Sequence, residues 1–414
     1  MSAPGRPLTV AEATALVLGR ARPGPARRVP IARAVDRTLA EPINADIDLP
    51  PFAKATMDGY AVRAADLAAP GTHALRALAA ILAGQAGEPP VGPGEAAPIM
   101  TGAPLPPGAD AVVPVERTRV DPAEPDQVLL DLPAVVPPGQ FVLPRGREMR
   151  QGDRLLDVGT RLGPASIGLL AAVGRADVVA IGPPSVAIFP TGDELVAPDR
   201  TPGPGQIRNS NGPLLAALVN GWADRAATEF PPIPDRAETL RATLGPPLAA
   251  WDVLILSGGV SMGVMDLVPA ALLDLGVEPV FHKVAVKPGK PIWFGVGPAR
   301  PDGRPGALVF GLPGNPASCV VGFLLFVRPA LDALAGRGAR PAAVEPTRLA
   351  VDFEHRGDRP TYHPAALGPD GVRPLAWAGS ADLRTVALAD GFAAFPAGDR
   401  RYRAGDEVGF LRLP

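Results

Sequence analysis

The sequence contains a single cysteine, Cys319, in 414 residues, which excludes a disulfide framework and any C-x-x-C zinc site. Its four histidines are scattered without an H-x-x-x-H pair, so any bound metal would be a hard cation with oxygen ligands. The formal net charge of −2 argues against a general nucleic-acid binder. The longest apolar run, residues 319–327, is too short to cross a bilayer, and the N-terminus lacks the apolar core of a signal peptide. We therefore expect a soluble, cytoplasmic protein without nucleic-acid or membrane partners.

Lysine is also scarce. Only 4 of the 40 basic residues are lysines, which leaves 40 − 4 = 36 arginines. Three of the four lysines, Lys283, Lys287 and Lys290, fall within one short segment. Lysine is a compact point charge and arginine a broad planar fork, so the two do not substitute freely for each other. The cluster predicts a site shaped around a small anion.

The chain is long enough for two to four domains. We expect an N-terminal region at 1–172, with a helical part and an inserted, irregular β-rich segment at about 47–144. An α/β domain is expected at 175–335 and a small β domain at 340–414. Within the first region, Thr9 opens a capping box with Glu12 that starts a helix.

From about residue 177, continuous apolar strands alternate with helical segments, which predicts a parallel sheet covered on both faces. Asn211 and Asp235 are expected to cap two of the helices. In such sheets the loops after the carboxyl ends of the strands converge on the ligand. Three such loops are rich in glycine and polar residues: T-G-D-E at 191–194, S-G-G-V-S at 257–261 and G-L-P-G-N-P-A-S at 311–318.

These loops and the lysine segment together predict an oxyanion cradle. The turn at Gly258 and Gly259 would let backbone N–H groups approach an anion, with Ser257 and Ser261 as further donors. Gly-Gly turns after strands are equally often only tight packing. Residues four apart on a strand share a face, so Lys283 and Lys287 are expected on one side, with Lys290 beyond a Pro-Gly turn.

Four carboxylates are expected near the same edge, where they would repel an anion unless a cation bridges them: Asp193, Glu194, Asp235 and Asp266. Mg²⁺ bridging carboxylates and phosphates is the usual solution. Asp235 and Asp266 are equally well explained as helix caps, whereas Glu194 is a stronger candidate for a ligand or an acid/base. No serine lies in a nucleophile elbow and Cys319 reads as a buried small hydrophobe, so the site is suited to positioning and charge neutralisation.

Several long motifs, taken in order, resemble the molybdopterin molybdenumtransferase family, the molybdenum insertases that include bacterial MoeA and the E domain of gephyrin. The N-terminal matches are L-P-P-F-A-K-A-T-M-D-G-Y-A-V and I-M-T-G-A-P-L-P-P-G-A-D-A-V-V. The later ones are P-T-G-D-E-L, S-G-G-V-S-M-G-V-M-D, K-P-G-K-P and G-L-P-G-N-P-A-S. The resemblance covers nearly the whole chain. It implies a multidomain α/β fold in which a MoaB/Mog-like sheet domain lies between a β-rich N-terminal region and a small β-barrel-like C-terminal domain.

The resemblance also implies a reaction: adenylated molybdopterin and molybdate give molybdenum cofactor and AMP, assisted by Mg²⁺ or a similar divalent cation. The family works as a homodimer with a shared site, and transient contact with other proteins of the pathway is expected. The positions it implies are Asp58, Glu194, Asp235, Asp266 and Lys283 for catalysis; Lys287, Lys290, Ser318, Arg359 and Ser380 for molybdate; Thr101, Ser257, Gly258, Gly259, Ser261, Pro313, Gly314, Asn315 and Pro316 for the pterin nucleotide; and Glu148, Glu194, Asp235 and Asp266 for the metal.

This chain departs from the family pattern at a few positions. Ala53 and Lys54 replace a polar pair, Pro98 stands where a basic residue is common, and Glu148 replaces the more usual Asp. The motif G-S-A-D-L-R-T around Ser380 is a loose match. Two other functions stay open: adenylylation of molybdopterin, which would suit a standalone sheet domain, and a non-catalytic molybdopterin carrier or scaffold.

Overall fold

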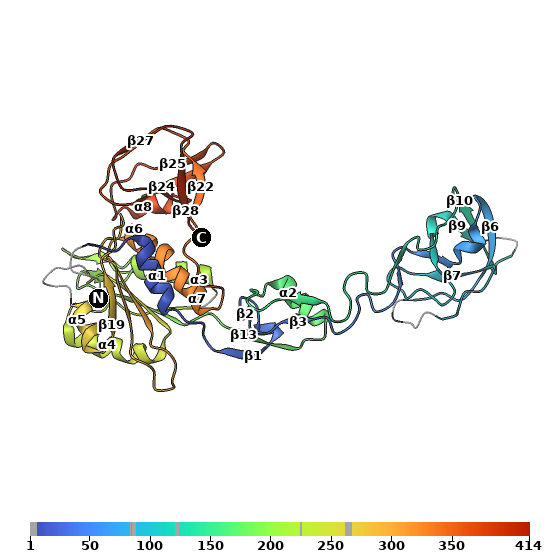
Figure 1. Cartoon of the computed structure of the whole chain (residues 1–414), viewed down its shortest axis with the longest axis horizontal. Helices are drawn as coiled ribbons and strands as arrows, with labels where there is room; N and C mark the ends of the chain where they lie inside the picture. The colour runs from blue at the N-terminus through green and yellow to red at the C-terminus, as the bar shows by residue number, and fades with distance from the viewer. Residues whose placement is uncertain (1–5, 83, 85–87, 121–123, 224–225, 261–266) are drawn as a thin grey trace. The chain divides into compact units, whose positions relative to one another are not determined.

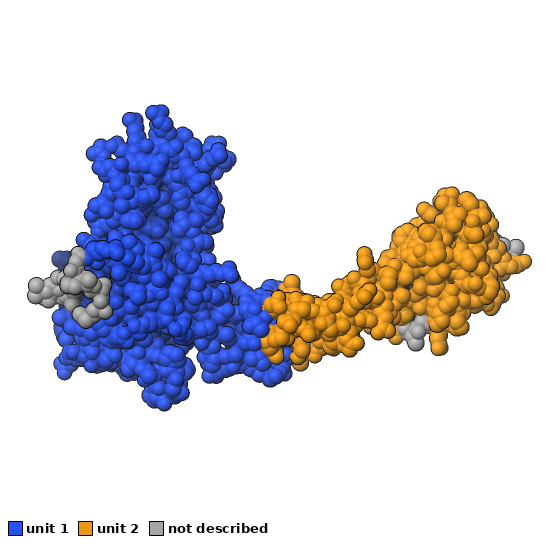
Figure 2. Space-filling view, in the orientation of Figure 1, with its two compact units in different colours: residues 1–40, 158–164, 177–414 blue, residues 41–157, 165–176 orange. Residues whose placement is uncertain are grey.

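The computed structural model describes residues 6–414 except 83, 85–87, 121–123, 224–225 and 261–266. The chain forms two compact units (Figure 2). Unit 1 comprises residues 1–40, 158–164 and 177–414, and unit 2 comprises residues 41–157 and 165–176. The candidate site residues Ser261 and Asp266 lie outside the described residues.

A six-stranded sheet forms the centre of unit 1, with the strand order β17-β14-β18-β21-β20-β19. Figure 1 labels its edge strand β19. Every residue of β14, β18 and β21 is buried, which explains why their sequences are continuous apolar runs. The bounds are β14 (Val186–Pro190), β17 (Ala227–Glu229), β18 (Val253–Ser257), β19 (Glu278–His282), β20 (Trp293–Val296) and β21 (Leu308–Leu312).

The sheet is mixed, so the prediction of a purely parallel sheet is wrong in this respect. β14, β17, β18 and β21 pair in parallel, whereas β20 is antiparallel to both of its neighbours, β19 and β21. Parallel neighbours need a crossover of about a dozen residues, usually a helix. The connections at 283–292 and 297–307 contain no helix, and the chain turns straight back into the next strand.

Helices cover both faces of this sheet, because successive strand residues point into two separate hydrophobic clusters. Ile188 and Ile255 belong to one cluster, and Phe189 and Leu256 to the other. The first cluster involves α1 (Val10–Arg20), α3 (Asn211–Trp222), α6 (Pro316–Gly322), the π-helical turn η4 (Phe323–Val327) and α7 (Arg328–Leu334). The second involves α4 (Ala237–Ala250) and α5 (Val268–Asp274).

The continuous helical run Pro316–Leu334 has the length and apolar composition of a membrane span, but 83% of it is buried inside the protein. It packs against the sheet and against α1 and α3. Its apolar character is therefore explained by its place in the core of unit 1.

The sequence predicted N-terminal caps for three helices, and the structure confirms one of them. The capping box of α1 is confirmed, because Thr9 Oγ1 accepts from the Glu12 N–H at 3.2 Å and Glu12 accepts from the Thr9 N–H at 2.8 Å. The predicted caps Asn211 and Asp235 are wrong: Ser210 precedes α3 and Arg236 precedes α4, and neither of these two side chains makes a cap hydrogen bond. At the start of α3, Asn209 Oδ1 accepts from the Gly212 N–H at 3.0 Å. Asn211 instead donates its side-chain N–H to the Gly314 carbonyl at 2.7 Å, so a tertiary contact takes the place of the cap.

Two smaller sheets complete the first part of unit 1. An antiparallel sheet has the order β1-β13-β2, and a parallel pair joins β15 and β16. Their bounds are β1 (Ala26–Pro30), β2 (Thr38–Leu39), β13 (Asp177–Ile181), β15 (Leu195–Val196) and β16 (Ile207–Arg208), with the 3-10 turn η1 (Ile31–Arg33) between β1 and β2.

The C-terminal part of unit 1 is an antiparallel five-stranded sheet of order β22-β28-β26-β24-β25, with the pair β23–β27 and the short helix α8. The Ala350 N–H donates to the Val372 carbonyl at 2.8 Å, which joins the chain after β22 to the opposite edge strand. The bounds are β22 (Glu345–Arg348), β23 (Phe353–His355), β24 (Thr361–Gly368), β25 (Gly371–Pro374), α8 (Leu383–Ala387), β26 (Gly391–Phe395), β27 (Arg400–Tyr402) and β28 (Glu407–Arg412).

Unit 2 contains a six-stranded sheet of order β8-β5-β7-β6-β10-β9 and the pairs β11–β4 and β12–β3. Its hydrophobic clusters are separate from those of unit 1. The bounds are β3 (Ile43–Asn44), β4 (Lys54–Ala55), β5 (Gly59–Val62), η2 (Ala64–Leu67), β6 (Gly71–Ala77), β7 (Glu95–Ile99), β8 (Ala111–Pro114), η3 (Val115–Arg117), β9 (Thr118–Val120), β10 (Gln127–Leu132), β11 (Val142–Leu143) and β12 (Arg154–Leu156). Helix α2 (Pro164–Ala172) begins at a proline, which is tolerated in the first turn of a helix.

Candidate functional site

The loops after β14, β18 and β21 are held together by their own backbones. The Thr191 N–H donates to the Ser257 carbonyl at 2.9 Å, and the Gly258 N–H donates to the Leu312 carbonyl at 3.0 Å. Because these three strands are parallel and adjacent, the loops after their carboxyl ends lie at one edge of the sheet. The predicted convergence of these loops is therefore present.

The turn after β18 depends on its glycines. Gly258 and Gly259 have φ values of +97° and +61°, which side-chain-bearing residues rarely adopt. A Cβ at Gly258 would lie 2.5 Å from the Thr191 carbonyl oxygen. The hydroxyl of Ser257 is buried and has no hydrogen-bond partner within the described residues. The turn is thus tightly packed, and within the described residues the Ser257 hydroxyl beside it is available to bond a ligand.

The lysine segment does not form the predicted strand. β19 ends at His282, and Lys283 has a φ of +80° with its N–H donating to the Ile292 carbonyl at 2.9 Å. Lys283 and Lys287 therefore do not share a strand face, because the chain turns back toward β20 between them. His282, which the sequence did not single out, donates from Nε2 to the Val260 carbonyl at 2.9 Å and so joins this segment to the Gly-Gly turn.

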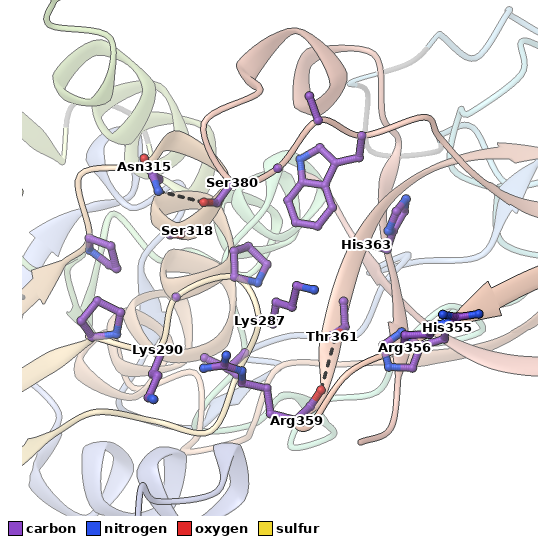
Figure 3. Close-up of a pocket in the computed structure, with 18 of the residues that line it drawn as sticks. Lys287, Lys290, Asn315, Ser318, His355, Arg356, Arg359, Thr361, His363 and Ser380 are labelled. Atoms are coloured by element: carbon purple, nitrogen blue, oxygen red, sulfur yellow. Dashed lines mark hydrogen bonds between the residues drawn. The ribbon is translucent and has the colours of Figure 1, made fainter. Parts of the chain in front are cut away.

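A cavity of about 630 Å³ lies between the sheet domain and the C-terminal β domain of unit 1 (Figure 3). The backbone of Lys287 joins the two walls, since its N–H donates to the Pro360 carbonyl at 2.9 Å and its carbonyl accepts from the Tyr362 N–H at 2.7 Å. The candidate residues that line the cavity come from both walls: Lys287, Lys290, Pro313, Asn315, Ser318, Arg359 and Ser380.

The cavity has an excess of positive charge. Arg356 pairs with Glu354, and Arg359 contacts Asp358 at 3.1 Å. Within the described residues, Lys287 and Lys290 have no carboxylate partner at ion-pair distance. Two unneutralised ammonium groups in a half-enclosed space favour an anion there.

Hydrogen bonds fix the upper rim of the cavity. The Asn315 side-chain N–H donates to Ser380 Oγ at 2.8 Å, and the Ala317 N–H donates to the Ser380 carbonyl at 3.1 Å. Figure 3 shows Lys287, Lys290 and Arg359 below this Asn315–Ser380 bond. Ser318, in the first turn of α6, is 3% exposed. Ser380, whose motif is only a loose match to the family, thus contacts the loop that follows β21, at Asn315 and Ala317.

The sequence did not single out several lining residues from the C-terminal domain. His355 Nε2 and Trp377 Nε1 are buried and have no hydrogen-bond partner within the described residues. Burial lowers the pKa of His355, and the nearby Lys287 lowers it further. His363 packs edge-on against Trp377 and hydrogen-bonds the Leu375 carbonyl at 2.8 Å. The side chains of His355, His363 and Trp377 thus add neutral hydrogen-bonding groups to the wall that the C-terminal domain contributes, and none of the three lies in a recognised motif.

The other candidates of the sheet domain lie outside the lining of this cavity: Lys283, Ser257, Gly258, Gly259, Gly314, Pro316, Glu194 and Asp235. The Asp235 N–H donates to Asp193 Oδ1 at 3.2 Å, and the Glu194 carboxylate folds back over Gly192, where a Cβ would meet it at 2.4 Å. No group of three or more Asp, Glu, His or Cys that could hold a metal occurs in the described part of the chain. The described carboxylates therefore do not form a complete metal site by themselves.

The remaining candidates belong to unit 2. Asp58 accepts from the Thr101 N–H at 2.7 Å and from Thr101 Oγ1 at 2.8 Å, and these bonds lower the pKa of Asp58. Lys54 lies 3.6 Å from Glu148, both partly exposed. Lys54 and Glu148, which both depart from the family pattern, thus form an ion pair that the sequence did not predict.

Three family models match successive parts of the chain. The MoeA N-terminal region (domain I and II) matches residues 8–174, the probable molybdopterin binding domain matches 187–333, and the MoeA C-terminal region (domain IV) matches 346–413. Fold and site together define a multidomain protein of the MoeA type, with a C-terminal β-rich domain beside an α/β molybdopterin-binding domain.

Relatives along the whole chain agree with these models. The molybdopterin molybdenumtransferase of a Nostoc species is 36% identical over 91% of this chain and 86% of its own length, and that of Bacillus subtilis is 33% identical over 98% and 94%. Two structures of molybdopterin biosynthesis MoeA proteins from Pyrococcus horikoshii, both with a TM-score of 0.79, are 33% and 27% identical and cover 99% and 98% of this chain. They are themselves covered completely, at 100%. The chain belongs to the molybdopterin molybdenumtransferase family.

Proposed function

We propose that this protein inserts molybdate into adenylated molybdopterin and releases AMP, which completes the molybdenum cofactor. The observation that carries this proposal is the cavity that Lys287 and Lys290 line together with Ser318 and Arg359, where neither lysine has a carboxylate partner among the described residues. Molybdate is a compact tetrahedral dianion, and such an anion suits point-charge lysines and a hydroxyl donor.

The loops beside the cavity suit the pterin nucleotide. Asn315, next in the chain to Gly314 and Pro316, lines the cavity, and the turn at Gly258 and Gly259 is anchored to the strand that leads into this loop. The Ser257 hydroxyl, which has no hydrogen-bond partner in the described part of the chain, supplies a donor at the turn. We therefore assign the nucleotide part of the substrate to these loops, with the dithiolene directed toward Lys287 and Lys290.

The chemistry then needs little more than charge neutralisation and positioning. Water completes the phosphate of molybdopterin as the anhydride bond to AMP breaks, and Lys283 offsets the charge that collects on the phosphates. The two dithiolene thiols form bonds from sulfur to molybdenum, and their two protons leave with one molybdate oxygen as water. Lys287 and Lys290 hold the dianion during this exchange.

We also propose that a divalent cation, with Mg²⁺ as the first candidate, assists the release of AMP by neutralising phosphate charge. Glu194 and Asp235 lie in the loops nearest to the strand ends and offer oxygen ligands, and Mg²⁺ commonly takes its remaining ligands from phosphates and water. Glu148 and Asp266 are further candidates from the family resemblance. The same resemblance supports a homodimer in which Asp58 and Thr101 complete the site of the partner.

Release of AMP is the decisive experiment. The purified protein is incubated with adenylated molybdopterin, and AMP is measured by chromatography with and without molybdate and Mg²⁺. We expect AMP release that requires molybdate and is abolished by chelation of the metal. Consumption of ATP with molybdopterin would instead show an adenylyltransferase, and substrate binding without AMP release would show a carrier.

A further inference from the structure

A second cavity, of about 730 Å³, lies at the opposite edge of the same sheet. Asp252, directly before β18, and Leu308, at the start of β21, line it. The candidate functional site lies instead beyond the carboxyl ends of these strands. The second cavity is therefore separate from the proposed substrate site and needs its own explanation.

Arginine is strongly enriched in this cavity. Seven of its 22 lining residues are arginines, against 36 of 414 in the whole chain, an enrichment of nearly fourfold. Only two lining residues are acidic, so the formal charge of the lining is 7 − 2 = +5. The general preference of this sequence for arginine does not account for such a concentration.

Both acidic residues are already bound. Asp252 accepts from the Ser185 N–H and hydroxyl, each at 2.8 Å, and from Arg300 at 3.0 Å. Asp302 accepts from the Arg304 N–H at 3.1 Å and from its side chain at 2.6 Å. These contacts occupy both acidic groups of the described lining, so neither is left for the arginines of the opposite wall, to which residues 20–37 contribute.

Three arginines of the opposite wall have no carboxylate partner within the described residues: Arg22, Arg27 and Arg37. Arg37 is held in place, because its Nε donates to the Arg33 carbonyl at 2.9 Å and its guanidinium lies against Gly182. A Cβ at Gly182 would lie 2.5 Å from Arg37 Nη1, so a larger residue there would displace the arginine. The wall is thus shaped to present a guanidinium group to the cavity.

The rest of the lining indicates the kind of anion. None of the described lining residues is aromatic, so the cavity offers no aromatic ring on which a nucleobase could stack. Five lining residues are prolines, which limit backbone adjustment on binding. Guanidinium groups match phosphate oxygens in bidentate geometry. We propose that this cavity binds a non-aromatic anion with several phosphate charges, and that Arg22, Arg27 and Arg37 are its principal ligands.

The test uses isothermal titration calorimetry on the full chain with inorganic tripolyphosphate. Lys287→Ala/Lys290→Ala serves as the background, so that the anion cannot be retained by the substrate cavity. We expect one equivalent to bind, and Arg22→Gln and Arg27→Gln each to weaken binding about tenfold, as expected for loss of a charge-assisted hydrogen bond. Arg373→Gln, a change at an exposed arginine of β25, is the matched control and should leave the affinity within twofold.

Three results would overturn the proposal. The first is the absence of tripolyphosphate binding at millimolar concentration in a variant that keeps the wild-type melting temperature. The second is equal affinity in Arg22→Gln, Arg27→Gln and Arg373→Gln. The third is retention of poly-glutamate but not tripolyphosphate, which would assign the cavity to an acidic protein segment. None of these results depends on molybdate insertion, so the proposed function is tested separately.

Discussion

Replacement of Lys287 by alanine tests the proposed molybdate site, because it removes a charge from the cavity without removing the hydrogen bonds that join the two walls. The hydrogen bonds that join Lys287 to the C-terminal domain, at Pro360 and Tyr362, come from its backbone. The side chain has no ion-pair partner within the described residues. Lys287→Ala therefore removes a charge from the cavity and leaves the junction of the two walls intact, so we expect an unchanged melting temperature.

The magnitude follows from the charge. Two unit charges 4 Å apart attract by about 4 kcal/mol at an effective dielectric constant of 20. Lys287 is exposed on an open cavity, so solvent screening reduces this figure, and we take about 1.4–2.8 kcal/mol. That corresponds to a rise of about 10- to 100-fold in the KM for molybdate.

The assay measures AMP release at saturating adenylated molybdopterin over a range of molybdate concentrations. Lys287→Arg should recover part of the loss, because it keeps the charge but not the compact shape. The KM for adenylated molybdopterin should change by less than about threefold. A molybdate KM within twofold of the wild-type value, or equal to that of the control Arg373→Gln, would refute the assignment.

Three further predictions concern stability and reactivity. Thr9→Ala should lower the free energy of unfolding by about 1 kcal/mol through loss of the α1 cap, whereas Thr9→Ser keeps the capping hydroxyl and should not lower it; equal losses in urea titrations would contradict this. Cys319 is buried and donates to the Pro313 carbonyl at 3.0 Å, and burial raises the pKa of its thiol, so iodoacetamide at pH 8 should modify it only after unfolding. Burial lowers the pKa of His363 below its ordinary value of 6.5, so its contribution to stability is complete above pH 6.5 and is lost as pH falls below it. The melting temperature should therefore fall less between pH 7.5 and pH 5.5 in His363→Gln than in the wild type, and an equal fall would show that this ring is not responsible.

Much of the sheet domain was predictable from the sequence, because burial on both faces leaves a direct trace in continuous apolar strands such as Val253–Ser257. The glycine turns were predictable for a different reason, because only glycine fits at Gly258. The antiparallel strand β20 was not. Its direction depends on the length of the connection and the absence of a helix there, and a short apolar run looks the same in either direction.

The candidate site was predictable where a motif marks it and not elsewhere. Lys287, Lys290 and Ser318 lie in recognisable motifs, and the structure places all three around one cavity. His355 and Trp377 reach the same cavity from a β domain whose sequence is too irregular to show which residues meet the sheet domain. The prediction that Lys283 and Lys287 share a strand face is wrong because β19 ends at His282 and Lys283 has a positive φ.

The most direct measurement is a crystal structure of the full chain with molybdate, with anomalous data collected at the molybdenum edge. The account predicts one strong peak within hydrogen-bond distance of Lys287 and Lys290, between Ser318 and Arg359. A peak confined to the arginine-lined cavity, or no peak at a molybdate concentration that saturates AMP release, would contradict it.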